Sequence, residues 1–217
     1  MVEPATLPDV VPAVARSPIR PAEPVAVRRG WEVSSRRSDA ALRLVDCAPL
    51  AKVVVRGAPN GTAAAALGVR FGRAERDRAG TLVVGSGPGE WMLLGEPGQA
   101  GALAARAAAL PDGRYVAAVD VTHGRALMRL TGRDAAQALA KVCAIDFSDR
   151  ATPNGRAFRS AVAKLATDVV RDDRGATPSY LLHCERSSGQ YLFDALLDAG
   201  AEFDIDIDGC RDGNGLT

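Results

Sequence analysis

Hydrophobic and polar positions along the chain repeat one order of elements twice. Aliphatic runs predict strands at residues 51–56, 81–84, 90–94 and 115–121, and Ala-rich segments predict helices at 62–67 and 99–110. The same order returns as a strand at 126–130, a helix near 134–143, strands at about 160–165, 168–171 and 179–184, and a helix at 189–199. This repeated strand–helix–strand–strand–helix–strand order predicts an α+β fold of two units side by side, each with its helices on one face of a mainly antiparallel sheet.

The two ends of the chain lack this periodicity. Prolines punctuate residues 1–27, at Pro4, Pro8, Pro12, Pro18, Pro21 and Pro24. Because such spacing keeps a backbone out of regular ladders, we expect an extended, mobile tail there. Residues 204–217 begin with Asp204, Asp206 and Asp208, as an EF-hand calcium loop does, but its twelfth position is Gly215 in place of Glu. We therefore expect an acidic, frayed tail after one folded domain at residues 28–203.

Composition narrows the class of protein. The 217 residues are 47% hydrophobic and 24% charged, as in water-soluble globular domains, and the formal net charge is +1. The sequence has no block of like charges, which would indicate a nucleic-acid partner. It also has no apolar run that approaches the roughly 18 residues needed to span a membrane. The four cysteines form no Cys-x-x-Cys pair, which argues against zinc and against a disulfide framework. This usage favours reduced thiols in a cytoplasmic protein without a metal site.

Two places could carry chemistry. Asp168 lies on an otherwise apolar strand, and an unpaired carboxylate costs several kcal/mol to bury, so it is solvated, bonded to Lys164 or Arg171, or functional. His123 lies in the turn Asp120-Val121-Thr122-His123-Gly124, where an imidazole could act as an acid or base. In the structural alternative, the side chains of Asp120 and Thr122 fix the turn, and His123 caps it or packs against the next strand.

Several segments, in their order and spacing, resemble the gamma subunit of heterotetrameric sarcosine oxidase. The similarity extends from about Trp31 to Phe203, and its anchors are the segments at residues 52–57, 87–91, 120–125, 139–143 and 191–197. A wider resemblance to folate-dependent aminomethyltransferases, the glycine-cleavage T-proteins, implies two ferredoxin-like βαββαβ units, as in the folate-binding domain of that family.

The aminomethyltransferase resemblance also implies folate-binding residues. Gly155-Arg156 and Asp168 occupy the places of a Gly-Arg pair and of a carboxylate near tetrahydrofolate, so Asp168, Asp120, His123 and Arg156 are the candidate cofactor-binding residues. The chain departs from that family where a Gly-Gly pair is replaced by Lys164-Leu165-Ala166 and a second Asp by Val169.

Two functions follow from these resemblances. The first is a structural, non-catalytic subunit of a sarcosine oxidase-like complex, whose larger alpha and beta subunits hold flavin and NAD and pass the one-carbon unit to tetrahydrofolate. This function leaves the chain without a cofactor of its own and predicts an apolar docking patch, for which Trp31, Trp91 and the Pro-rich tail are candidates. The second is a stand-alone folate-dependent one-carbon transferase that uses Asp168 with Asp120 and His123.

Overall fold

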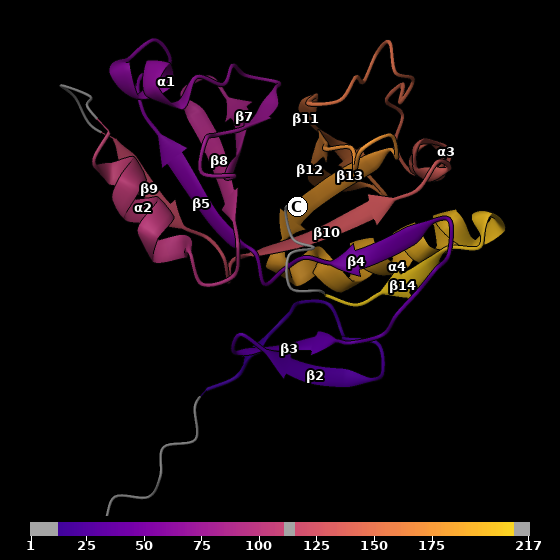
Figure 1. Cartoon of the computed structure of the whole chain (residues 1–217). Coiled ribbons are helices and arrows are strands. Elements are labelled where there is room, and N and C mark those ends of the chain that lie inside the picture. The colour runs from indigo at the N-terminus through magenta and orange to yellow at the C-terminus, as the bar shows by residue number, and fades with distance from the viewer. Residues whose placement is uncertain (1–12, 111–115, 211–217) are drawn as a thin grey trace, which may run out of the picture.

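Two mainly antiparallel sheets form the body of the structure, and helices cover the outer face of each (Figure 1). The computed structural model describes residues 13–110 and 116–210. The first unit contains β5 (Ala51–Arg56), α1 (Thr62–Leu67), β6 (Ala74–Arg76), β7 (Leu82–Gly87), β8 (Glu90–Gly95), α2 (Ala100–Ala108) and β9 (Ala117–Asp120). Its sheet order is β6-β7-β8-β5-β9, with every neighbouring pair antiparallel. The expected βαββαβ unit is confirmed, and β6 is an additional edge strand.

The second unit borrows a strand from earlier in the chain. It contains β10 (Arg125–Thr131), α3 (Ala135–Ala140), β11 (Ala157–Val162), β12 (Leu165–Arg171), β13 (Ser179–Glu185), a 3₁₀ turn η1 (Arg186–Ser188), α4 (Gly189–Gly200), a second 3₁₀ turn η2 (Ala201–Phe203) and β14 (Asp206–Asp208). The sheet order is β11-β12-β13-β10-β4-β14, in which β4 (Arg43–Asp46) precedes the first unit. β4 pairs with β10 at the place expected for the last strand of the unit, and β14 pairs with β4 instead.

Both ends of the chain are more regular than the sequence suggests. β1 (Ala15–Arg16), β2 (Val25–Arg28) and β3 (Trp31–Ser34) form a small sheet in the order β1-β3-β2. Ile19 is 1% exposed in the core of the second unit. The expected mobile tail at 1–27 is therefore wrong for β1 and β2, and Pro18, Pro21 and Pro24 lie in the loop between these two strands. The expected frayed tail at 204–217 is likewise wrong for β14; residues 1–12 and 211–217 lie outside the described part.

A central apolar cluster joins the two units. On their outer faces, the sheets pack against their own helices; for example, α2 buries Leu103 and Ala107 beneath it. On their inner faces, side chains of β7 and β8, such as Leu82 and Met92, pack with Leu127 of β10 and Leu181 of β13. Any polar side chain on these inner faces therefore lies at the junction of the two units. Within the described residues, no helix is long and apolar enough to cross a membrane.

The hairpin of β11 and β12 corrects a predicted turn. We expected strands at 160–165 and 168–171, but the chain turns at Ala163 and Lys164, whose φ angles are 48° and 68°. Two positive φ angles in a two-residue turn are typical of a type I′ hairpin, which favours Asn-Gly. Because Ala-Lys carries no such signal, the sequence conceals the turn. The resulting register places Arg159 opposite Asp168.

Candidate functional site

Three charged or titratable side chains form a row across neighbouring strands of the second sheet. Arg159 of β11 lies opposite Asp168 of β12, which in turn lies opposite His183 of β13. Arg159 donates from Nε to Oδ1 of Asp168 over 2.8 Å and from Nη2 to Oδ2 over 3.1 Å. Nδ1 of His183 lies 2.9 Å from Oδ2 of Asp168. Both carboxylate oxygens are thus engaged within the chain.

The electrostatics of Asp168 follow from this row. The side chain is only 17% exposed. Burial raises the pKa of Asp168, but the hydrogen bonds from His183 and Arg159 outweigh it, so the pKa lies below its ordinary value. Of the alternatives for Asp168, the structure shows the bonded one, but the expected partners are wrong: Lys164 lies in the turn and Arg171 bonds to Asp173. Knowing the register of the β11–β12 hairpin would have identified Arg159 as the partner of Asp168.

A small cavity lies beside this row, at the junction of the two sheets. Asp168 and His183 line it together with Ser86 of β7, and the rest of its wall is apolar, from Val84, Met92, Leu94, Leu127, Val170 and Leu181. Its volume is about 20 Å³, enough for one water molecule. Small-molecule sites commonly measure about 300–1,000 Å³. Tetrahydrofolate therefore does not fit the space that Asp168 faces.

The turn at residues 120–124 is held by its own side chains. Asp120 accepts a hydrogen bond from the backbone of Thr122 over 2.8 Å, and Thr122 Oγ1 accepts one from the backbone of Lys52 over 3.0 Å. The ring of His123 stacks on Trp31, with centroids 4.7 Å apart and planes 7° apart. The roles of Asp120 and Thr122 match the structural alternative for this turn, but His123 packs on Trp31 of β3 and not on the next strand, β10.

The structure does not gather the four candidate cofactor-binding residues into one site. Among the contacts of residues 13–110 and 116–210, no hydrogen bond or ion pair joins Asp168 to Asp120, His123 or Arg156. Arg156 is exposed where the two sheets meet. The two tryptophans are not an exposed docking patch either. Trp31 is 6% and Trp91 4% exposed, and Trp91 Nε1 donates to the carbonyl of Val69 over 2.8 Å.

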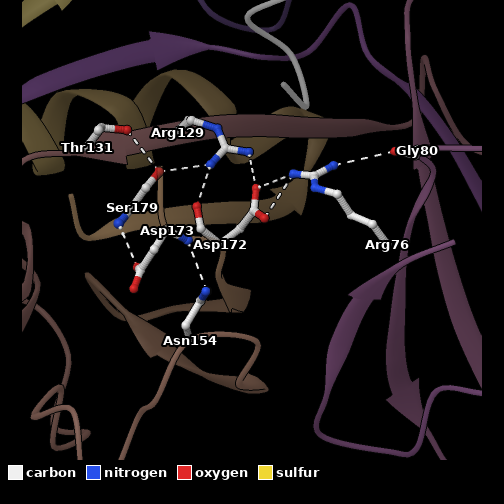
Figure 2. Close-up of polar contacts among 8 residues, drawn as sticks. All are labelled: Arg76, Gly80, Arg129, Thr131, Asn154, Asp172, Asp173 and Ser179. Carbon is white, nitrogen blue, oxygen red and sulfur yellow. Dashed lines mark hydrogen bonds and ion pairs between the residues drawn. The ribbon is translucent and has the colours of Figure 1, made fainter. Parts of the chain in front are cut away.

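A second polar cluster, which the sequence did not indicate, clamps the two units together (Figure 2). Both carboxylate oxygens of Asp172 accept from Arg76 of β6 at 2.9 Å, and Oδ2 also accepts from Arg129 of β10 at 2.6 Å. Arg129 bonds further to Ser179 Oγ at 2.8 Å. The side chain of Arg129 is 4% and that of Asp172 12% exposed. This ion-pair cluster links the edge of the first sheet to the interior of the second. Its role is therefore to stabilise the contact between the two units.

The part of the chain that the structure describes contains no set of side chains arranged to coordinate a metal ion. No group of three or more His, Cys, Asp or Glu side chains there is placed to hold a metal ion. Two carboxylates of the calcium-like segment are used within the fold. Asp206 pairs with Arg36 at 3.0 Å, and Asp208 accepts from the backbone of Ser38 at 3.3 Å.

Comparisons with known proteins agree with this geometry. A chain in the structure of heterotetrameric sarcosine oxidase from Corynebacterium sp. U-96, in complex with pyrrole 2-carboxylate, matches with a TM-score of 0.66 and 25% identity, over 78% of this chain and 89% of that chain. Glycine cleavage system aminomethyltransferase T from Bartonella henselae matches with a TM-score of 0.64 and 16% identity, over 85% of this chain and 55% of that one. The second similarity concerns the fold alone. No curated protein matches the sequence.

The family comparison confirms the resemblance seen in the sequence. The model of the "Sarcosine oxidase, gamma subunit family" matches residues 64–202. This range covers most of both units, from α1 to η2, and includes the Asp168 row and the Asp172 clamp. Because it exceeds half of the chain, the chain belongs to the sarcosine oxidase gamma subunit family.

Proposed function

We propose that this chain is the accessory gamma subunit of a heterotetrameric sarcosine oxidase-like complex, with a structural role. One observation carries the proposal. Asp168, the carboxylate that the aminomethyltransferase resemblance assigns to folate, is held by Arg159 and His183 beside a cavity that has room for one water molecule. A carboxylate committed to two internal partners supports the fold and is not available to a substrate.

The chemistry of the complex then belongs to its larger alpha and beta subunits. In this proposal they hold flavin and NAD, oxidise the N-methyl group of sarcosine to leave glycine, and pass the one-carbon unit to tetrahydrofolate. The match to a chain of heterotetrameric sarcosine oxidase over 89% of that chain supports this assignment of partners. Cysteine usage supports a cytoplasmic location, since Cys47, Cys143 and Cys184 are buried thiols that form no disulfide.

A stand-alone one-carbon transferase is less well supported. It would require Asp168 to leave Arg159 and His183 and to contact a pterin ring, and the inner faces of both sheets would have to separate to make room. Its other expected residues, Asp120 and His123, hold a turn and stack on Trp31.

The test is recovery of the tagged chain from its own cells, followed by an absorbance spectrum of the eluate. We expect a yellow complex that contains two larger chains, with flavin bands in the visible range. A colourless chain recovered alone, which then binds tetrahydrofolate on titration, would overturn the proposal and favour the transferase. The Asp168→Asn variant would then be the one to assay for lost folate binding.

A further inference from the structure

A short antiparallel ladder links the edges of the two sheets and places two arginines face to face. The backbone of Ala74 donates to Gly155 over 2.8 Å, and that of Ala157 donates to Gly72 over 3.0 Å. Between these two bonds, Arg73 pairs with Arg156 as an antiparallel bridge. This is a non-hydrogen-bonded pair, the kind in which facing residues lie closer together. The two Cβ atoms of such a pair are about 4.5–5.5 Å apart.

The two arginines carry like charge without a neutralising acid. Across residues 13–110 and 116–210, no carboxylate forms an ion pair or a hydrogen bond with either guanidinium group. Like charges directly opposite one another destabilise a strand pair. The surrounding arginines show the contrast, since Arg76 and Arg159 each have an acid partner. Within the described residues, the half-buried Arg73 and the exposed Arg156 therefore form a local concentration of positive charge without an acid partner.

Two glycines make room for this arrangement. Gly72 and Gly155 have φ angles of 79° and 77°, and each lies beside the arginine of the opposite segment. A Cβ on Gly72 would come within 3.2 Å of Arg156 Nη1, and one on Gly155 within 3.7 Å of Arg73 Nη2. The guanidinium groups thus lie along the opposing backbone, which reduces the conformational entropy that binding would cost.

The neighbouring surface is apolar. Phe71, in the segment that leads into this ladder, is 63% exposed. It forms the wall of an open groove with Pro59, Ala64, Val69 and Pro88. Exposed aromatic residues next to arginines are typical of protein interfaces and are depleted elsewhere on protein surfaces. A small free anion would make no use of Phe71.

We propose that Arg73 and Arg156 bind an acidic segment of a larger partner subunit through carboxylate side chains, with Phe71 packing against apolar residues of the same partner. This inference rests on the proposed function as a subunit. Charge complementarity selects the acidic partner, because a carboxylate placed between the two guanidinium groups accepts charge-assisted hydrogen bonds and removes the repulsion between them. We refer to Phe71, Arg73 and Arg156 as the acid-docking surface.

The experiment uses the complete complex, co-expressed with wild-type chain or with the double variant Arg73→Gln/Arg156→Gln. The matched control is Arg78→Gln/Arg150→Gln, which removes the same charge at two exposed positions outside the ladder. Dissociation of the chain from its partners is measured against salt concentration. We expect the double variant to raise the dissociation constant at least tenfold and to flatten its salt dependence, while the control stays within twofold of wild type.

A second readout separates docking from folding. The isolated Arg73→Gln/Arg156→Gln chain should melt at the wild-type Tm or about 1–3 °C above it, because a repulsion is removed. The variant Arg156→Glu, which places an acid opposite Arg73, should be at least as stable in isolation and should also fail to dock. Binding weakened together with unchanged or raised Tm supports the proposal.

Three results would overturn it. If wild-type chain assembles and the double variant assembles equally tightly at every salt concentration, the docking surface is elsewhere although the proposed function stands. If the double variant assembles normally but loses binding to heparin, the pair serves a free polyanion. If wild-type chain meets no partner at all, the proposed function fails first and this inference fails with it.

Discussion

Asp168 and His183 lie opposite one another on neighbouring strands, with 2.9 Å between Oδ2 and Nδ1. Arg159 completes the arrangement from the other side of Asp168. Here both neighbours are polar and bonded to it, so the acid contributes to the cohesion of β11, β12 and β13.

Replacing Asp168 with Asn should destabilise the chain more than the same replacement at an exposed carboxylate does. The variant removes the charge that Arg159 and His183 share, and hydrogen bonds to a charged group are worth about 1.5–3 kcal/mol each before the exposure of Arg159 reduces the effect. We expect a loss of about 1–3 kcal/mol in the free energy of unfolding, measured by urea titration. The control Asp39→Asn, at an exposed carboxylate, should change it by less than about 0.5 kcal/mol. Equal effects of the two variants would contradict a role for the Asp168 row in stability.

The clamp around Asp172 should respond unequally to its two arginines. Asp172→Asn removes the carboxylate that pairs with the buried guanidinium of Arg129, and breaking such a pair costs about 3–5 kcal/mol. Arg76→Gln removes a partner whose side chain is 34% exposed, for which we expect about 1 kcal/mol or less. Denaturant unfolding of both variants gives the comparison. A loss for Arg76→Gln as large as that for Asp172→Asn would show that the contact with Arg76, and not the pairing of the buried Arg129, accounts for the stability of the clamp.

Asp46 should make stability fall as pH rises. Burial raises the pKa of Asp46 to about 6, against the lowering effects of Ser17, the backbone of Ala48 and Lys52. A carboxyl whose pKa is higher in the folded than in the unfolded state is most stabilising while protonated, below about pH 4, and this contribution is lost as pH rises through 6. Asp46→Asn should remove that loss.

The measurement is the difference in unfolding free energy between Asp46→Asn and wild type at pH 4 and pH 7. We expect this difference to increase in favour of the variant by about 1–2 kcal/mol, after allowing for the partial exposure of the side chain. Asparagine can keep the 2.8 Å bond from the backbone of Ala48. If the difference in unfolding free energy does not change with pH, ionisation of Asp46 does not destabilise the folded chain.

Substitutions in the hairpin turn at Ala163 and Lys164 should stabilise the chain. Both residues adopt positive φ angles, which cost a residue with a Cβ about 1 kcal/mol relative to Gly in a left-handed conformation. The variant Ala163→Asn/Lys164→Gly should raise the unfolding free energy by about 1 kcal/mol, measured by urea titration. The reversed order, Ala163→Gly/Lys164→Asn, is a matched control that should gain less. A loss of stability in both variants would contradict the type I′ turn.

Much of the fold could be predicted from hydrophobic periodicity. The strand at 51–56 and the helix at 62–67 coincide with β5 and α1, because a continuous aliphatic run and an Ala-rich segment lie between clear Gly and Pro breaks. β4 was missed because its short Arg43–Asp46 run carries charge at both ends. Its place beside β10 depends on a crossing of the chain that no local pattern records.

The site was less accessible to sequence reasoning. Asp168 was identified as a carboxylate that must be bonded, solvated or functional, but its partners depend on register, and register depends on a turn at Ala163 without Asn or Gly. The same register places His183 opposite Asp168, and no local sequence pattern indicates that pairing. The inter-unit contacts of Asp172 and of Arg156 arise from the packing of two units, which the order of elements predicts but does not position.

In our proposal, this chain supports a sarcosine oxidase-like complex without supplying its chemistry. The most direct measurement is sarcosine turnover, with and without tetrahydrofolate, by complexes that contain wild-type or Asp168→Asn chain, normalised to bound flavin. We predict turnover and methylenetetrahydrofolate yield within twofold of wild type for every complex that assembles. Loss of methylenetetrahydrofolate formation by tenfold or more, in an Asp168→Asn complex with its full complement of flavin, would contradict the account and make Asp168 a residue of the folate site.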